Sequence, residues 1–193
     1  MRILALLLLV LALPALQGCF PVVAAGAVGG AVIASDRRST GTFIEDQEIE
    51  FKASNRLNEH LQNRVHVNTT SYNHVVLLTG EAPTAALKRQ AVQVVRTIPN
   101  VRGVVNEIAV TAPTSFASRS NDTYITSKVM ARFVDAGKFP PVYVKVVTED
   151  GVVYLMGLVT HREATDAVEI ARTTSGVKKV VKVFQYMGTA TAK

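Results

Sequence analysis

The side chains in this 193-residue sequence that could act as nucleophiles or metal ligands show no spacing typical of a catalytic or metal site. The histidines are scattered along the chain without a ligand spacing such as His-x3-His; they are His60, His66, His74 and His161. The sequence has neither a Gly-x-Ser-x-Gly nucleophile motif nor a phosphate-binding loop. The carboxylate pair Glu149-Asp150 stands in a turn sequence, where aspartate is favoured for backbone reasons. We therefore predict no catalytic residue, no metal site and no cofactor, and hence a protein that is not an enzyme.

The single cysteine, Cys19, ends an apolar N-terminal run that begins with Met1-Arg2. One positive charge, about a dozen apolar residues and then small residues before a cut site are typical of a secretory signal. The ending Leu16-Gln17-Gly18-Cys19 resembles a bacterial lipobox, whose cysteine receives diacylglycerol and acyl chains such as palmitate. We predict a lipoprotein signal peptide over residues 1–18 and a lipid-modified Cys19. The alternative is an inert thiol after an ordinary signal or within a membrane span, although prolines interrupt any such span.

Composition agrees with a location in a bacterial envelope. Removal of residues 1–18 deletes Arg2 and lowers the formal net charge from +6 to +5. One cysteine allows no intrachain disulfide, even in an oxidising compartment. Phe20 stands where an aspartate typically retains such lipoproteins in the inner membrane, so we predict an outer-membrane anchor facing the periplasm. Nucleic acid is not an expected partner, because the chain has no Trp and no aromatic cluster beside basic residues.

Residues 19–44 are predicted to be the acylated cysteine followed by a flexible tether. The stretch 22–34 contains only Val, Ala, Gly and Ile, and its glycines disfavour a stable helix. It is too short to cross a bilayer, which requires about 20 apolar residues. The polar residues 35–41 that follow are typical of a flexible linker.

Beyond the tether the sequence is duplicated. Val65-His66-Val67 leads to a strand ending at Gly80, and Val142-Tyr143-Val144 leads to a strand ending at Gly157, with fifteen residues from the first valine to the glycine in each case. Valines later in the two copies repeat at an offset of 76; they are Val101, Val104 and Val105, then Val177, Val180 and Val181. Such agreement of spacing indicates an internal repeat.

Each copy predicts the order helix, strand, strand, helix, strand. The opening helices carry apolar residues at i, i+4 and i+8; these are Ile49, Ala53 and Leu57, then Ile125, Val129 and Phe133. Asn121 or Asp122 is the expected N-cap of the second opening helix, and Thr160 to Glu163 fits a capping box. The closing strands, 104–110 and 180–186, return by a crossover into the same sheet. We predict an α+β fold of two units at 45–110 and 120–187, joined by a linker at 111–119 and followed by a tail at 188–193.

The ordered motifs resemble those of the BON domain. The shared features are the strand ending in Val-x-Leu-x-Gly, the helix after it and the step Gly176-Val177-Lys178-Lys179-Val180. The lipobox, the Ala/Gly-rich tether and two such copies resemble the dual-BON outer-membrane lipoproteins associated with division and envelope stress. That resemblance implies two αββαβ units, each a three-stranded mixed sheet packed on two helices. It also implies a non-enzymatic protein that binds anionic phospholipid.

Charge distinguishes the two units. Residues 45–110 contain seven basic and seven acidic residues. Residues 120–187 contain nine basic and seven acidic residues, an excess of two positive charges. Lysines near an anionic bilayer contribute on the order of 1 kcal/mol each, although a solvated face is the simpler explanation of charge alone. With the family resemblance, we predict a phospholipid-binding surface in the second unit, made by Tyr124, Leu158, Val159, Thr160 and Arg162. Leu158 or Val159 could equally serve as a hydrophobic staple for the helix after Thr160.

Gly80 and Gly157 are predicted to be structural, ending each central strand where the backbone turns into a helix. Two functions remain open at this stage. In the first, the protein is a tethered adaptor whose second unit recognises anionic phospholipid, which would place it at particular membrane regions such as the division site. In the second, it is a periplasmic scaffold that binds outer-membrane assembly or cell-wall proteins under envelope stress.

Overall fold

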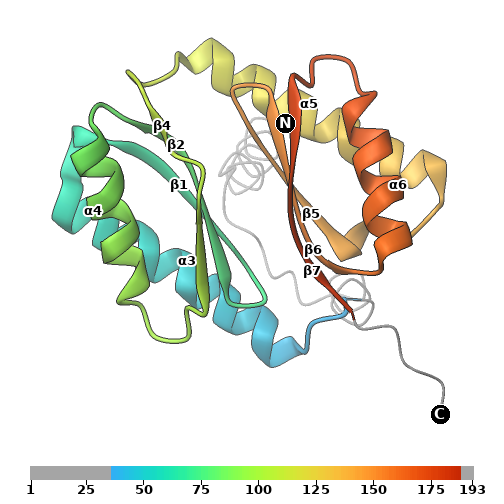
Figure 1. The fold of residues 1–193 in the computed structure, drawn as a ribbon, viewed down its shortest axis with the longest axis horizontal. Helices are drawn as coiled ribbons and strands as arrows, with labels where there is room; N and C mark the ends of the chain where they lie inside the picture. Colours follow the sequence, from blue (N-terminus) through green and yellow to red (C-terminus); the bar gives the residue numbers. More distant parts are fainter. Residues whose placement is uncertain (1–35, 188–193) are drawn as a thin grey trace, which may run out of the picture. The chain divides into compact units, whose positions relative to one another are not determined.

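The computed structural model describes residues 36–187, which fall within one compact unit, Ser35–Lys193. They form two copies of the predicted order of elements (Figure 1). The first copy contains α3 (Thr40–Leu61), the short 3-10 helix η2 (Gln62–Arg64), β1 (His66–Tyr72), β2 (Val75–Ala82), α4 (Ala85–Arg96), β3 (Gly103–Asn106) and β4 (Ala109–Val110). The second contains α5 (Phe116–Ala136), the 3-10 helix η3 (Pro141–Tyr143), β5 (Val144–Glu149), β6 (Val152–Val159), α6 (His161–Arg172) and β7 (Lys179–Tyr186). The predicted signal peptide, Cys19, most of the tether and the tail lie outside the described residues.

Each copy builds one mixed sheet, as predicted. The orders are β1-β2-β3 and β5-β6-β7, with an antiparallel hairpin first and a parallel strand added after the crossover helix. In the first copy the closing strand is split, and its second piece, β4, pairs with the end of β2. The split occurs where Asn106 Oδ1 accepts a hydrogen bond from the Ile108 amide and the Ile108 side chain enters the core. The continuous strand predicted over 104–110 is therefore wrong at this point, whereas β7 runs without a break.

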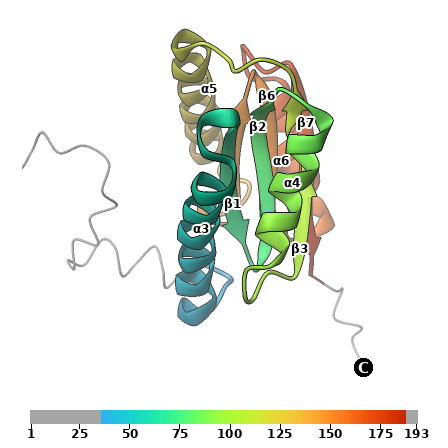
Figure 2. The ribbon, with the colours of Figure 1, turned by 90° about the vertical axis from the view of Figure 1, so that its left-hand side faces the viewer.

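Two helices cover one face of each sheet, and Figure 2 shows α3 with α4 on the first and α5 with α6 behind them. The helix residues at i, i+4 and i+8 point inward as predicted; they are Ile49, Ala53 and Leu57 in α3, and Ile125, Val129 and Phe133 in α5. These residues form two separate cores with the inward side chains of their own sheets. Within residues 36–187, none of the helices combines the length and apolarity needed to cross a membrane.

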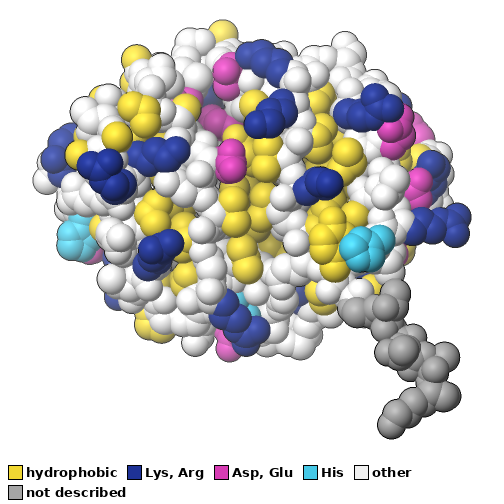
Figure 3. Space-filling view, viewed as in Figure 1, with side chains coloured by type: hydrophobic (Ala, Val, Ile, Leu, Met, Phe, Trp, Pro, Cys, Tyr) yellow, Lys and Arg dark blue, Asp and Glu magenta, His cyan; other side chains and the backbone are white. Residues whose placement is uncertain are grey.

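The other faces of the two sheets pack on each other. A third apolar cluster joins them, centred on Tyr72 and Leu77 from the first copy and on Tyr154 and Met156 from the second. Strands β2 and β6 are therefore covered on both faces, which is why they are apolar at nearly every position. Figure 3 shows bands of hydrophobic side chains along the strands in the middle of this face of the molecule.

Both opening helices begin earlier than predicted. Ser39 and Ser115 are the N-caps, and their hydroxyls accept hydrogen bonds from the amides of Thr42 and Ser118. A serine in this position satisfies one of the free amides of the first turn. The predicted linkers at 35–41 and 111–119 are therefore shorter than expected, and the predicted N-cap at Asn121 or Asp122 is wrong. The capping box at the start of α6 is confirmed.

Two buried aspartates on the opening helices bind the hairpin turns of their own copies. Asp122 accepts hydrogen bonds from the amides of Asp150 and Gly151 at 2.9 and 2.7 Å. Its counterpart Asp46 accepts from the amides of Asn73 and His74 at 2.7 and 2.9 Å. All four turn residues have positive φ, as a two-residue type I′ turn requires. Each aspartate thus stabilises a turn whose backbone is otherwise unfavourable for most residues.

Candidate functional site

The residues predicted to bind phospholipid do not form one surface. Tyr124 lies on α5 near the hairpin end of the second sheet, where neighbouring Thr126 bonds Thr148 at 2.7 Å. Arg162 lies in the first turn of α6, beside the far end of α5, where Lys138 pairs with Asp166. Fourteen residues of chain separate Tyr124 from Lys138, which is about 20 Å along a helix and the turn after it. Tyr124 and Arg162 are therefore at opposite ends of the second unit.

The three residues between β6 and α6 have structural roles. Val159 is fully buried in the core of the second copy, together with Ala164, the position it would contact in a hydrophobic staple. Leu158 packs against the cluster between the two sheets. Thr160 is the N-cap of α6, and its hydroxyl accepts from the Glu163 amide. Of the two apolar residues predicted to contact lipid here, Val159 is buried in the core and Leu158 is partly buried against the cluster between the sheets, so neither offers a freely exposed side chain.

The exposed apolar surface of the second copy lies instead along α5. Phe116 is 77% exposed, Tyr124 62% and Val134 63%. The other exposed residues between Phe116 and Val134 are uncharged and either small or polar; they are Ala117, Ser120, Asn121, Thr123, Ser127 and Ala131. Lys128 sits over the Tyr124 ring, with its ammonium 4.5 Å from the ring centroid. Phe116 was missed because the sequence placed it in a linker.

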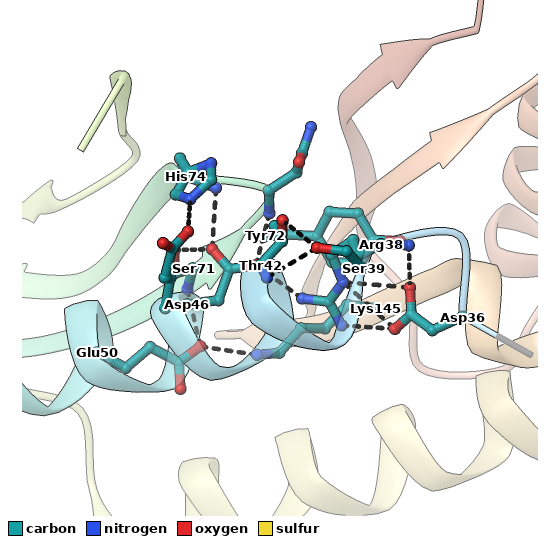
Figure 4. A network of polar contacts seen from close by, with 12 residues as sticks. Asp36, Arg38, Ser39, Thr42, Asp46, Glu50, Ser71, Tyr72, His74 and Lys145 are labelled. Atoms are coloured by element: carbon teal, nitrogen blue, oxygen red, sulfur yellow. Dashed lines mark hydrogen bonds and ion pairs between the residues drawn. The ribbon is translucent and has the colours of Figure 1, made fainter. Parts of the chain in front are cut away.

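The segment before α3 is not a free tether. The Arg38 side chain pairs with Asp36 at 2.7 Å and with Asp46 at 2.9 Å, and its guanidinium lies 4.0 Å from the centroid of the Tyr72 ring (Figure 4). Burial alone would lower the pKa of Arg38, but its hydrogen bonds to the two carboxylates raise it. Burial likewise opposes ionisation of Asp46, yet hydrogen bonds from Ser71, His74 and other donors hold the pKa of its carboxyl below the usual value.

Arg37 connects the same segment to the second copy. Its two terminal nitrogens donate to the Glu163 carboxylate, both at 2.7 Å, and Nη1 also donates to the Leu158 carbonyl at 2.9 Å. The guanidinium stacks 3.7 Å from the centroid of the Tyr143 ring. The hydrogen bond from Arg37 lowers the pKa of Glu163 to about 2. We call residues Asp36–Arg38 the strap, because its two arginines contact both copies.

Further polar contacts join the two copies around the strap. Glu50 of α3 pairs with Lys145 of β5 at 2.7 Å and also accepts from the Ser71 amide. Asn73 in the first hairpin turn donates to Gln185 of β7 at 2.7 Å. The two sheets are therefore held by apolar packing at the centre and by polar contacts at the rim.

With this geometry in place, comparison with known proteins decides the family. The BON domain matches residues 45–112 and 121–188, one match for each copy. The chain belongs to the BON-domain family.

Relatives of this BON protein cover most of its length. It is 40% identical over 174 residues to the outer membrane lipoprotein DolP of Haemophilus influenzae, a match covering 89% of this chain and 90% of that one. It is 32% identical over 154 residues to the 21 kDa hemolysin of Actinobacillus pleuropneumoniae, covering 79% of each. It is 30% identical over 155 residues to osmotically-inducible protein Y of Escherichia coli, a match covering 78% of this chain and 77% of that one. The first relative confirms the predicted dual-BON outer-membrane lipoprotein family and the predicted location.

Both glycines predicted to be structural lie within strands of the BON domains, two residues before the strand ends. A Cβ at Gly80 would stand 2.1 Å from the His66 carbonyl oxygen, and Gly80 has a φ of +99°. A Cβ at Gly157 would stand 2.4 Å from the Tyr143 carbonyl oxygen, but the φ of Gly157 is not positive. The expected sharp turn into a helix is therefore wrong for both. At both positions the backbone of the preceding segment, at His66 or at Tyr143, approaches too closely for a side chain.

The basic residues of the second BON domain are spread over its surface. Lys178 pairs with Asp150 at 2.8 Å in an exposed ion pair, and Arg172 pairs with Glu169 at 2.6 Å. Lys179 and Lys182 are exposed on β7. Each of these ion pairs is nearly neutral at a distance, so Lys179 and Lys182 carry the excess positive charge of this set.

Proposed function

We propose that the protein is an outer-membrane-anchored, non-enzymatic lipoprotein whose second BON domain binds anionic phospholipid of the phosphatidylglycerol type. Lipid chains on Cys19 would supply the stable attachment, since more than one acyl chain is needed for lasting anchorage. The second contact would select membrane regions rich in anionic lipid, such as a division site. Its role would be to support outer-membrane integrity.

The observation that carries this proposal is the outer face of α5. Phe116, Tyr124 and Val134 expose large apolar side chains there, and Lys128 supplies a cation beside one of them. Insertion of apolar surface contributes roughly 25 cal/mol per Å², so three partly inserted side chains give only a few kcal/mol. A lysine near an anionic surface adds on the order of 1 kcal/mol. Such weak binding becomes effective because the anchor at Cys19 raises the local concentration of the domain at the membrane.

Vesicle co-sedimentation of the compact unit Ser35–Lys193, which lacks the anchor, tests the lipid contact. We expect binding to vesicles containing phosphatidylglycerol and little binding to phosphatidylcholine vesicles. Tyr124→Glu should reduce binding on the order of tenfold, because a carboxylate replaces an inserted ring beside anionic headgroups. The matched control is Phe51→Glu on α3, which changes an equally exposed ring in the first domain. Equal binding by both variants and the unmodified protein would exclude α5 as the lipid surface.

The anchor is tested separately in cells. Cys19→Ala should release the protein from the membrane fraction or leave it uncleaved, because it removes the site of lipid attachment. Mass spectrometry of the native protein should show an acylated N-terminal cysteine. An unmodified mature Cys19 would exclude this part of the proposal while leaving the lipid contact of α5 intact.

A second candidate function rests on α3. Its outer face exposes Ile44 and Phe51, but the helix carries five acidic and two basic residues. An apolar face with this charge suits a basic protein partner rather than an anionic bilayer. The second candidate is therefore a scaffold that binds outer-membrane assembly or cell-wall proteins through the first BON domain. Crosslinking from Phe51 in cells would support it if a partner is captured and if Phe51→Glu abolishes the capture.

A further inference from the structure

Strands from both BON domains bring three ligand-type side chains together at the rim of the interface between the sheets. His66 lies at the start of β1 and faces Glu81 of β2, whereas Glu149 ends β5 of the second domain. One ligand atom from each residue lies within 4.8 Å of those of the other two. His66 Nδ1 is 3.0 Å from Glu81 Oε2. No sequence motif predicts this cluster, because its three members are 15 and 68 residues apart along the chain.

The two carboxylates are buried and short of positive charge. Glu81 is 2% exposed and Glu149 is 8% exposed. Glu149 accepts a hydrogen bond from the neutral amide of Asn68 at 2.9 Å. Within residues 36–187, His66 is the one basic side chain that pairs with either carboxylate. A protonated His66 would balance only one of two negative charges, and buried charges are costly unless they are fully compensated.

The neighbouring Tyr154 has no positively charged form, so it cannot balance the two carboxylates, and its phenol is also kept neutral. Burial, together with the charges of Glu107 and Glu149, raises the pKa of Tyr154 to about 12. Tyr154 therefore stays neutral near pH 7. Glu107 adds a third carboxylate to this end of the interface.

The internal duplication offers a direct comparison for this cluster. The hairpin registers relate positions 66, 72 and 81 of the first domain to positions 143, 149 and 158 of the second, at an offset of 77. The contact between His66 and Glu149 therefore has a counterpart at the other end of the interface, between Tyr143 and Tyr72. There the Tyr72 hydroxyl lies 3.5 Å from the Tyr143 carbonyl oxygen. The two ends of the interface are thus related by the repeat.

The two related ends differ in their cations. At the end with Tyr143, Arg37 of the strap stacks on the ring and donates to the Leu158 carbonyl. At the end with His66, the residues related to Tyr72 and Leu158 are the carboxylates Glu149 and Glu81. The chain positions related to the strap are 112–114, Ala-Pro-Thr, which carry no charge. The acidic end thus has the greater need for a cation and receives none from the corresponding segment.

We propose that His66, Glu81 and Glu149 bind a divalent cation of the zinc class, which links the two BON domains. An imidazole with two carboxylates suits zinc, whereas magnesium and calcium prefer sites made of oxygen atoms alone. Zinc accepts three protein ligands with water in the fourth position, at about 2.0–2.2 Å from nitrogen and oxygen. The carboxylates must therefore move toward one another by small rotamer changes. His66 is partly exposed and gives the ion a route from solvent.

Such an ion would stabilise the packing of the two sheets. Two ligands belong to the first domain and one to the second, so loss of the ion would leave two carboxylates facing each other across the interface. A ligand that binds only the folded arrangement raises the melting temperature in proportion to the logarithm of its concentration above Kd. This role does not depend on lipid binding by α5, which lies on the helical side of the second sheet.

Calorimetric titration of the full chain in a neutral detergent, without a polyhistidine tag, tests the proposal with zinc chloride as the probe. We expect one zinc per chain, a rise in melting temperature and reversal of both by a chelator. Magnesium chloride at the same concentration should have no effect. His66→Asn and Glu149→Gln should each weaken zinc binding on the order of tenfold or more, because each removes a direct ligand.

The matched controls are His60→Asn and His161→Asn, which remove exposed histidines outside the cluster and should leave zinc binding unchanged. Zinc K-edge absorption of the unmodified protein should show one imidazole among nitrogen and oxygen ligands, a readout independent of whether a variant folds. Absence of binding, equal affinity in the His66 variant, or a spectrum without imidazole would overturn the proposal. A shift of stability with pH that depends on His66 but not on zinc would also overturn it.

Discussion

The two opening helices occupy equivalent places in two copies of one fold, yet their solvent faces differ in chemistry. At an offset of 76 residues, Glu48 of α3 corresponds to Tyr124 of α5, and Thr40 corresponds to Phe116. Helix α3 has five acidic and two basic residues, whereas α5 has two acidic and three basic residues. Their buried faces are alike, because both must pack against the same kind of sheet. The two copies thus share the pattern of their cores, whereas their solvent-exposed surfaces differ in charge and apolarity.

The strap introduces a second asymmetry between the copies. Asp46 and Asp122 bind equivalent hairpin turns, but the first also pairs with Arg38. At the N3 position of the crossover helix, Glu163 of α6 receives Arg37, whereas α4 has Leu87. The strap therefore contacts the turn-binding aspartate of one copy and the crossover helix of the other. The first described residues of the chain are thus held against both domains.

The largest effect that would separate the copies is expected at the strand glycines. Gly80→Ala should lower the free energy of unfolding by about 3–4 kcal/mol, because the new methyl group meets a carbonyl oxygen and the residue has positive φ. Gly157→Ala should cost about 1–3 kcal/mol, because only the steric contact applies. Urea denaturation of both variants measures the difference. Equal losses would show that the positive φ of Gly80 carries no penalty.

The next largest difference should appear at the buried aspartates. Asp46→Asn should destabilise the protein by about 3 kcal/mol, because it removes the charge that faces a buried arginine. Asp122→Asn should cost about 1–2 kcal/mol, because its partners are backbone amides and an amide oxygen can replace one carboxylate oxygen. Thermal and urea unfolding of the two variants should rank them in this order. The reverse ranking would mean that the strap contributes nothing to the first domain.

A smaller, pH-dependent effect is expected at the contact between the strap and α6. Glu163→Gln should cost about 1.5–2 kcal/mol at pH 7, because the carboxylate receives two charged hydrogen bonds. The pKa of Glu163 is lowered from 4.5 to about 2 in the folded protein, so this stabilisation is present above pH 4.5 and lost as the pH falls toward 2. Unfolding curves of the variant and the unmodified protein should therefore converge over that range. Arg37→Ala should remove the same pH dependence.

The smallest effect on stability, and the most informative one for function, concerns the solvent faces of the opening helices. Tyr124→Glu makes α5 resemble α3 at this position, and it should leave the melting temperature nearly unchanged while reducing vesicle affinity about tenfold. Leu158→Glu should instead lower the melting temperature, because it places a charge in the packed layer between the sheets and should destabilise the fold. Thermal melts beside vesicle binding distinguish the two outcomes. A stable Leu158→Glu protein that fails to bind vesicles would restore Leu158 as a lipid contact.

Much of the fold could be predicted because its signals are local. Residues spaced as Ile125, Val129 and Phe133 can bury one face only as a helix, and a glycine in Asp150-Gly151 favours a tight hairpin. The helix starts were less certain, since serine, asparagine and aspartate are all good caps and only packing chooses among them. Asp122 has a side chain suited to an N-cap but lies nearly two turns inside the helix. There its carboxylate accepts hydrogen bonds from the hairpin turn between β5 and β6.

The sequence alone determined the duplication, the αββαβ order, the family and the outer-membrane lipoprotein class, because each depends on spacing or on a contiguous motif. Tertiary structure decided which apolar residues are surface and which are core. Leu158 and Tyr124 are both apolar enough for either place, and only the packing of the two sheets partly buries the first and leaves the second in solvent. It also decided where Arg37 and Arg38 bind, and that His66 meets Glu149 across the interface. These contacts depend on distances in space between residues far apart in the chain, which no local pattern of side chains encodes.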